Sequence, residues 1–158
     1  MIEVRTMEQK EREPATARMV CTIGYEGRDL NELVRELAAR GVQQAIDVRR
    51  RAISRKPGFS KSALRSRLEE AGISYVHMPE LGTPDDVRRA LKKGGSLAAF
   101  MKEYGAYLDS RREAFGLFRE LVLRRPSAIV CFERVHVRCH RSLLAERLSI
   151  EGLQVEHI

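Results

Sequence analysis

The strongest constraint on the fold is a regular alternation of apolar runs of strand length with amphipathic stretches of helix length. The apolar runs predict five strands, at residues 19–25, 44–49, 73–79, 127–132 and 153–158. The stretches between them predict helices at residues 29–41, 60–72 and 140–152, and a longer helical region at 85–125 that is broken near residues 94–95 and 109. The first two helices each begin with a capping side chain, Asp29 or Ser60, and end at a glycine.

This alternation predicts an α/β fold. Runs that are apolar throughout are typical of strands buried on both faces, so we expect a mostly parallel five-stranded sheet with helices on both faces. Right-handed crossovers then predict a single Rossmann-like three-layer domain over residues 19–158, with strand order 3-2-1-4-5. A chain of 158 residues is large enough to bury such a core without disulfides or a structural metal.

Residues 1–18 are charged and lack an apolar core of the length that an export signal or a membrane anchor needs. We therefore expect a poorly ordered tail and no contact with a membrane. The chain has three cysteines, and an odd number without an export signal favours free thiols over disulfides. We expect a cytoplasmic protein. Cys21 falls within the first predicted strand and is expected to be a small core residue.

Positive charge is concentrated in one segment. The formal net charge is +7, and residues 48–68 alone contain eight basic residues and no acidic one. Such a concentration is typical of a phosphate-binding surface, so we expect a phosphate-bearing ligand, with DNA or RNA among the candidates, bound through the basic segment Arg49 to Arg67. The alternative is a solvated loop followed by an arginine-rich helix face. Aromatic side chains are not interleaved with these charges, so a stacking platform for single strands is not predicted.

Three polar loops are predicted to meet at one edge of the sheet. Doubly wound sheets bind ligands beyond the carboxyl ends of their strands, where the strand order reverses. The loops that follow the first, second and fourth strands are residues 24–29, 47–59 and 131–141. The last of them, CFERVHVRCHR, carries most of the reactive side chains.

Cys139 and His140 stand at the predicted start of the last helix. The helix dipole and nearby arginines lower the pKa of a thiol in that position, so Cys139 is a candidate nucleophile. The free N–H groups of the helix, beside Arg141, form an anion site whether or not the thiol reacts. Glu133 is the best-placed carboxylate for proton transfer.

A metal centre in this loop would use Cys131, His136, Cys139 and His140, because thiolate and imidazole ligands suit zinc. Their spacing matches none of the usual zinc motifs, and the adjacent Cys139 and His140 are awkward ligands for one tetrahedron. We therefore expect no metal site and no cofactor.

Further polar residues are expected at the same edge. Asp47 either orients Arg49 toward an anion or forms a structural salt bridge with it, and His77 either lines the site or closes a proline turn. Glycines on both sides of Tyr25-Glu26 permit close backbone approach. The predicted catalytic residues are Asp47, Cys131, Glu133, Cys139 and His140. The predicted substrate-binding residues are Gly24, Tyr25, Arg49, Ser54, Arg55, His77 and Arg141.

The chain resembles the family catalogued as domain of unknown function 488 in four stretches: TIGYEGRDLNELVREL, AIDVRRRAISRKPGFSKSALRSRLEEAGISYVHMPELG, FMKEYGAYL, and IVCFERVHVRCHRSLLAERL with the final VEHI. The resemblance runs from about residue 20 to the C-terminus, and Cys-x-Glu followed by Cys-His-Arg is its most specific part. It implies a Rossmann-like α/β fold and no particular activity.

The resemblance also implies a set of signature residues: Gly24, Asp47, Arg49, Ser54, His77, Leu81, Gly82, Cys131, Glu133, Cys139, His140 and Arg141. This chain departs from the family pattern at Ala52-Ile53-Ser54, where Pro-x-Ser is usual, and at Tyr25, where a small residue is usual. A fainter resemblance, to rhodanese domains, implies a sulfurtransferase or a thiol phosphatase as a minor alternative. The bulky His140 and Arg141 directly after Cys139 depart from that pattern.

Two hypotheses of function follow. In the first, the protein is an enzyme that acts on a nucleic acid, a nucleotide or another phosphate-bearing substrate. Arg49, Arg55 and Arg141 would hold the phosphate, Glu133 or His140 would move a proton, and a cysteine would be nucleophilic or structural. In the second, the protein is a non-catalytic module that binds nucleic acid through the basic segment. We favour the enzyme, because thiols, imidazole and carboxylate are more than phosphate binding requires.

Overall fold

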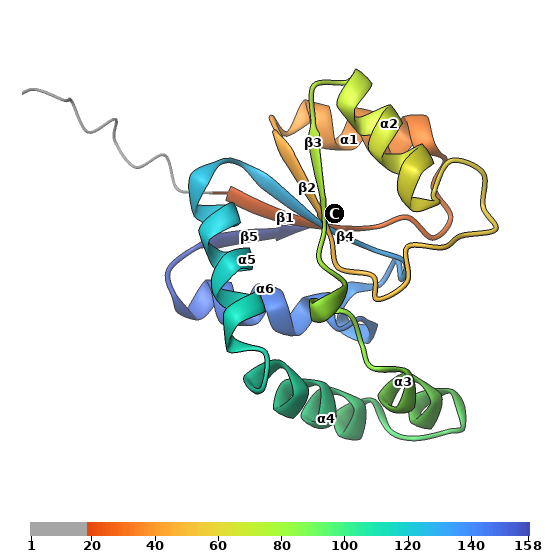
Figure 1. The fold of residues 1–158 in the computed structure, drawn as a ribbon, viewed down its shortest axis with the longest axis vertical. Helices are drawn as coiled ribbons and strands as arrows, with labels where there is room; N and C mark the ends of the chain where they lie inside the picture. Colours follow the sequence, from red (N-terminus) through yellow and green to blue (C-terminus); the bar gives the residue numbers. More distant parts are fainter. Residues whose placement is uncertain (1–18) are drawn as a thin grey trace, which may run out of the picture.

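The computed structural model describes residues 19–158, and the predicted tail at residues 1–18 lies outside the described part of the chain. The domain is built on a five-stranded sheet in which every strand pair is parallel (Figure 1). The strands are β1 (Met19–Gly24), β2 (Gln44–Asp47), β3 (Ser74–His77), β4 (Ser127–Cys131) and β5 (Gln154–His157). The predicted five-stranded α/β fold is confirmed.

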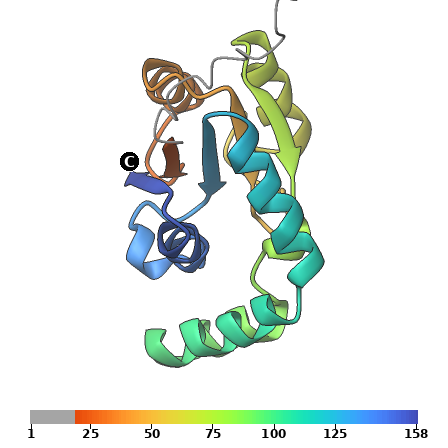
Figure 2. The same cartoon turned by 90° about the vertical axis from the view of Figure 1, so that its left-hand side faces the viewer.

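Helices cover both faces of the sheet, which makes the fold a Rossmann-like three-layer domain. The helices are α1 (Leu30–Ala39), α2 (Lys61–Glu70), α3 (Asp85–Lys92), α4 (Leu97–Asp109), α5 (Arg112–Arg124) and α6 (Arg141–Ile150). Apolar side chains of α1 and α2 form a buried cluster with one face of the sheet, and those of α4, α5 and α6 form a second cluster with the other face. Figure 2 shows the same layers from the side, with α4 below the sheet.

The predicted strand order was wrong in one respect. The order is β3-β2-β4-β1-β5 rather than 3-2-1-4-5, so β4 lies between β2 and β1. Ser127, the first residue of β4, stands opposite Gln44 on one side and Val20 on the other. A central strand must be apolar on both faces, and the runs that form β1 and β4 both satisfy this condition. The hydrophobic pattern therefore could not decide which of the two is central.

Local signals in the sequence agree with the helix boundaries. The Asp29 carboxylate accepts a hydrogen bond of 2.7 Å from the backbone N–H of Glu32, as an N-cap should. Ser60 also stands at the N-cap of its helix, although its side chain makes no capping hydrogen bond. The predicted long helical region is three helices, interrupted at Gly94-Gly95 and at Ser110-Arg111. Within residues 19–158, no helix is both long enough and apolar enough to span a membrane.

Candidate functional site

The three predicted loops meet at the carboxyl edge of the sheet. Because β4 is central, the loop that follows it lies between the loops after β1 and β2. Backbone hydrogen bonds join them, since Tyr25 N–H donates to the Cys131 carbonyl (3.1 Å) and Val48 N–H donates to the Val130 carbonyl (3.2 Å). The convergence predicted from a sheet of different strand order is therefore present, because β1, β2 and β4 lie side by side in both orders.

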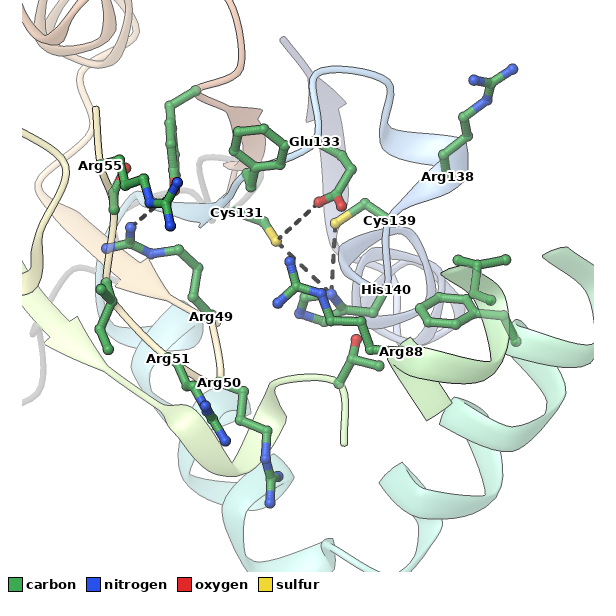
Figure 3. A pocket seen from close by; sticks show the side chains of 17 residues that line it. Arg49, Arg50, Arg51, Arg55, Arg88, Cys131, Glu133, Arg138, Cys139 and His140 are labelled. Carbon is green, nitrogen blue, oxygen red and sulfur yellow. Dashed lines mark hydrogen bonds between the residues drawn. The ribbon is translucent and has the colours of Figure 1, made fainter. Parts of the chain in front are cut away.

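A pocket of about 280 Å³ opens at this edge, between the three loops and helices α3 and α4 (Figure 3). Its lining residues are Tyr25, Arg49, Arg50, Arg51, Ile53, Ser54, Arg55, Thr83, Arg88, Leu91, Phe100, Cys131, Phe132, Glu133, Arg138, Cys139 and His140. Figure 3 shows the guanidinium groups of the β2 loop across the pocket from the two cysteine sulfurs. The pocket thus combines a positively charged wall with a wall of reactive side chains.

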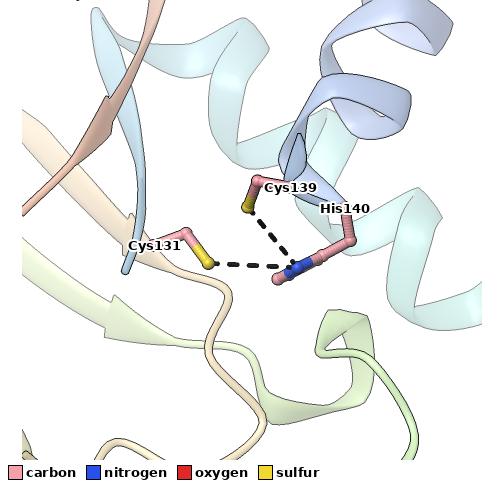
Figure 4. A group of neighbouring side chains, drawn as sticks. All are labelled: Cys131, Cys139 and His140. Atoms are coloured by element: carbon pink, nitrogen blue, oxygen red, sulfur yellow. Dashed lines mark hydrogen bonds between the residues drawn. The ribbon is translucent and has the colours of Figure 1, made fainter. Parts of the chain in front are cut away.

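Two cysteines and a histidine converge in the pocket floor (Figure 4). Cys131 ends β4, while Cys139 and His140 stand at the start of α6. The His140 Nδ1 atom lies 3.7 Å from the Cys139 sulfur and 3.9 Å from the Cys131 sulfur. On its other side, the ring Nε2 is 3.0 Å from the Val48 carbonyl, and the ring of Tyr104 packs edge-on against it. The imidazole is therefore held in one orientation.

The pKa values of Cys131, Cys139 and His140 all differ from those of isolated side chains. Burial opposes ionisation of Cys139, but the hydrogen bond from Cys131 and the charges of His140 and Arg141 outweigh it and hold the pKa of Cys139 well below its usual value. Burial also lowers the pKa of His140, but the adjacent Cys139 thiolate raises it more, so the net shift is upward. The hydrogen bond to Cys139, with burial, raises the pKa of Cys131. Cys139 and His140 thus each favour the charged form of the other.

Glu133 stands next to this cluster. Its carboxylate lies 3.9 Å from the Cys131 sulfur and lines the pocket. Burial, and after it the charge of Cys139, raises the pKa of Glu133 above its usual value. A half-buried carboxyl group with a raised pKa is suited to giving and taking a proton.

Arg141 supports the loop that carries Glu133. The side chain is fully buried, and its guanidinium donates hydrogen bonds to the carbonyl oxygens of Glu133 and Arg134. Arg141 was predicted to bind substrate, but it lies outside the residues that line the pocket. In this position it is a positioning residue.

Asp47 and Arg49 form a buried salt bridge below the pocket. The Asp47 carboxylate accepts hydrogen bonds from the Arg49 guanidinium (2.6 and 2.9 Å) and from the Tyr75 hydroxyl (2.5 Å). The remaining guanidinium nitrogen donates to Tyr25 Oη and to the Phe59 carbonyl. Burial alone would lower the pKa of Arg49, but Asp47 raises it. Asp47 therefore orients Arg49, each of whose three guanidinium nitrogens donates a hydrogen bond within the protein. Asp47 itself does not line the pocket.

The other predicted site residues either line the pocket or lie in the structure around it. Tyr25 lines the pocket with its ring stacked on Phe59 at 4.4 Å, and Ser54 and the exposed Arg55 line it as well. The ring Nε2 of His77 is 2.7 Å from the Arg49 carbonyl, outside the pocket lining. Gly24 lies directly beneath the Glu133 backbone.

The residues of the basic segment are divided between the pocket and helix α2. Arg50, Arg51 and Arg55 line the pocket, whereas Lys61, Arg65 and Arg67 lie on or beside α2. Arg65 packs over the ring of Tyr75, and Arg67 donates to Asn31. The helical part of the segment is thus the arginine-rich helix face of the alternative interpretation.

Several lining residues were not predicted. Arg88 and Leu91 come from α3, Phe100 from α4, and Thr83 from the turn before α3. Arg138, in the turn before α6, also lines the pocket. No motif links α3 or α4 to the cysteine loop, because their contribution depends on how the chain folds back below the sheet.

Replacing Gly24 with alanine is expected to destabilise the protein by about 1–3 kcal/mol, the usual cost of overpacking. A Cβ at this position would lie 1.8 Å from the Glu133 carbonyl oxygen and 2.9 Å from the Arg134 Cα, and the carbonyl groups of both residues are held by the buried Arg141. Denaturant unfolding measures the change. The control is Gly116→Ala within α5, where a Cβ meets nothing within 4 Å and where alanine should stabilise by about 0.5–1 kcal/mol. Equal stability of Gly24→Ala and the wild type would show that the Glu133 backbone does not lie this close to Gly24.

The fold and the site together define a Rossmann-like α/β protein with an arginine-lined pocket that also contains cysteine, histidine and glutamate side chains. A family model described as domain of unknown function DUF488 matches residues 29–148, so the chain belongs to this family. The resemblance noted from the sequence motifs is thereby confirmed. No curated protein and no solved structure matches the chain.

Proposed function

We propose that the protein is an enzyme that acts on a phosphate-bearing substrate, such as a nucleotide or the end of a nucleic acid, bound in the arginine-lined pocket. The observation that carries this proposal is the presence in one pocket of five outward arginines and a Cys-His-Glu group. The arginines, Arg50, Arg51, Arg55, Arg88 and Arg138, are hereafter the pocket arginines.

The charge of the pocket favours an anionic ligand. Among residues 19–158, Arg51 is the one pocket arginine with a salt bridge, to Asp85, and that pair is exposed to solvent. The remaining four have no carboxylate within salt-bridge distance in this part of the chain, although Arg50 donates to Tyr107 Oη. Guanidinium groups bind phosphate with charge-assisted and often paired hydrogen bonds, so phosphate is the ligand group that suits them best.

The size of the pocket favours a small group over a duplex. A volume of about 280 Å³ is close to the lower limit of small-molecule sites, which begin at about 300 Å³. A nucleotide or a single terminal nucleotide is of this size. Exposed apolar side chains at the rim, Ile53 and Phe132, offer contacts for a base or another flat group.

The cysteine, histidine and glutamate side chains of the pocket favour catalysis over simple binding. A binding module needs the arginines, but it has no use for two thiols, an imidazole and a half-buried carboxyl group converging beside them. Cys139 is only 1% exposed, which weighs against the sulfurtransferase and thiol phosphatase alternatives, because those reactions need an accessible sulfur. Glu133 is the group we assign to proton transfer.

A screen of phosphate-bearing compounds tests the proposal. The full chain would be incubated with nucleotides, short single-stranded oligonucleotides and phosphorylated sugars, and conversion would be followed by mass spectrometry. On a substrate found this way, Arg88→Gln and Arg138→Gln are each expected to weaken binding about tenfold or more, since a hydrogen bond to a charged group contributes about 1.5–3 kcal/mol. Binding should also fall steeply as salt concentration rises.

The matched control is Arg124→Gln, which changes an exposed arginine of α5 that lies outside the pocket and pairs with Glu120. It is expected to leave affinity and conversion unchanged. Equal affinity in Arg88→Gln, Arg138→Gln and Arg124→Gln would show that the pocket arginines do not hold the substrate.

A further inference from the structure

We infer that Cys131, Cys139 and His140 form a zinc site whose open coordination position faces the arginine-lined pocket. These three side chains are hereafter the Cys-Cys-His cluster. The site deepens the proposed function by naming a cofactor for the same pocket. Its catalytic role rests on that function, but its existence rests on the donor geometry alone.

The spacing of the three donor atoms is that of a tetrahedral zinc ion. All three lie within 4.8 Å of one another, with Nδ1 of His140 at 3.7 and 3.9 Å from the two sulfurs. Zinc distances of about 2.3 Å to sulfur and 2.0–2.1 Å to nitrogen put neighbouring donors roughly 3.5–3.8 Å apart. An ion can therefore be held if the nitrogen–sulfur distances shorten by a few tenths of an ångström and the sulfur–sulfur distance by at most about 1 Å (Figure 4).

The histidine is oriented as a zinc ligand. Its Nε2 lies 3.0 Å from the Val48 carbonyl, and a carbonyl oxygen only accepts hydrogen bonds, so Nε2 carries a proton. A neutral imidazole in this tautomer has its lone pair on Nδ1, the atom that faces both sulfurs. Zinc-bound histidines usually donate their second N–H to a carbonyl or carboxylate in this way. The contact with Tyr104 further restricts the ring.

The backbone conformation allows the adjacent residues Cys139 and His140 to bind the same ion. Cys139 is extended, with φ −121° and ψ 143°, whereas His140 has the helical values −56° and −24°. This change of conformation between neighbouring residues turns both side chains toward the same point. His136, the fourth ligand considered from the sequence, is not part of the cluster, because its ring stacks on His157 at 3.6 Å.

Three protein ligands with one open position are typical of catalytic zinc, whereas structural zinc has four. All three cluster residues line the pocket, so the open position faces the space where substrate would bind. A water in that position has a lowered pKa and becomes a nucleophile near neutral pH. The Glu133 carboxylate, which lies 3.9 Å from the Cys131 sulfur, is placed to take the proton of that water.

Two thiolates and an imidazole select zinc over magnesium, calcium or manganese, which prefer oxygen ligands. The donors are also better suited to an ion than to direct attack on a substrate. Cys131 and Cys139 are 4% and 1% exposed, so a substrate atom reaches the sulfurs poorly, whereas an ion fits between them.

Titration of the reduced, chelator-treated full chain with Co²⁺ and then with Zn²⁺ tests the site. We expect one equivalent of Co²⁺ to bind with a thiolate-to-cobalt charge-transfer band and the intense visible bands of four-coordinate cobalt, and Zn²⁺ to displace it. Cys131→Ser and Cys139→Ser should each weaken the charge-transfer band, and His140→Gln should lower the affinity at least tenfold. The control, Cys21→Ala, changes a thiol in β1 and should leave the spectrum unchanged.

Circular dichroism shows whether each variant folds. If one does not, X-ray absorption spectroscopy of the zinc-loaded wild type provides a second measurement, because it should show two sulfur ligands and a histidine nitrogen around the ion. Failure of the wild type to bind either ion, or an unchanged cobalt spectrum in both serine variants, would overturn the site. The proposed function fails separately, if zinc binds but no phosphate-bearing compound is converted and the pocket arginines do not affect binding.

Discussion

Replacing Asp47 with alanine is expected to lower the free energy of unfolding by about 3–5 kcal/mol, the range seen when one partner of a buried ion pair is removed. The Asp47 side chain is fully buried, and Arg49 is only 6% exposed. Loss of the carboxylate would leave a buried guanidinium charge without its counter-ion and a buried Tyr75 hydroxyl without its acceptor. The penalty is therefore that of an uncompensated buried charge.

Denaturant unfolding measures this effect, and a surface pair provides the matched control. Arg51 and Asp85 also form a 2.7 Å salt bridge, but their side chains are 68% and 46% exposed. Asp85→Ala should therefore cost no more than about 1 kcal/mol. Similar losses in the two variants would show that Asp47 does not stabilise Arg49 in the way its burial implies. Because Asp47 fixes the position of Arg49 in the pocket wall, Asp47→Ala should also disturb the shape of the pocket and weaken substrate binding.

Replacing Glu133 with glutamine is expected to reduce turnover about 10²–10⁴-fold, the usual contribution of a general acid or base. Glutamine keeps the size of the side chain but cannot accept or release the proton. The pocket arginines are untouched, so substrate affinity should change little. Steady-state kinetics on a substrate from the screen, with binding measured separately, would separate the two effects.

Glu146→Gln is the matched control, because Glu146 is an exposed carboxylate of α6 that does not line the pocket. It should leave turnover and affinity unchanged. Full turnover in Glu133→Gln would remove Glu133 from the reaction. If the arginine variants weaken binding while no conversion is found for any compound, the alternative of a non-catalytic binding module is favoured instead.

The secondary structure was predictable because its signals are local. Hydrophobic periodicity and capping residues act within one element, so five strands, the Asp29 cap and the breaks in the region 85–125 agree with the structure. The carboxyl edge of a parallel sheet also follows from topology alone. For that reason the cysteine loop could be assigned to the site, even though the strand order was wrong between β1 and β4.

The roles of individual side chains depended on contacts between distant segments. Arg141 and Arg55 are equally basic in the sequence, but Arg141 is buried under two loop carbonyls while Arg55 faces the pocket. Arg88 joins the pocket only because α3 folds back below the sheet. In each case burial, which is a property of the whole fold, decides whether a charged side chain faces the pocket or supports a loop.

The sequence by itself thus determined the α/β class, the helices and strands, and the loop that contains the two cysteines, His140 and Glu133, because these follow from short-range pattern. Only the tertiary structure decided that Cys131 reaches Cys139 and His140, eight and nine residues further along the chain. The sequence argued against a shared metal, because the spacing matches none of the usual zinc motifs and because Cys139 and His140 are adjacent. Strand β4 and helix α6 instead place the sulfur and nitrogen atoms of these three side chains within 4.8 Å of one another.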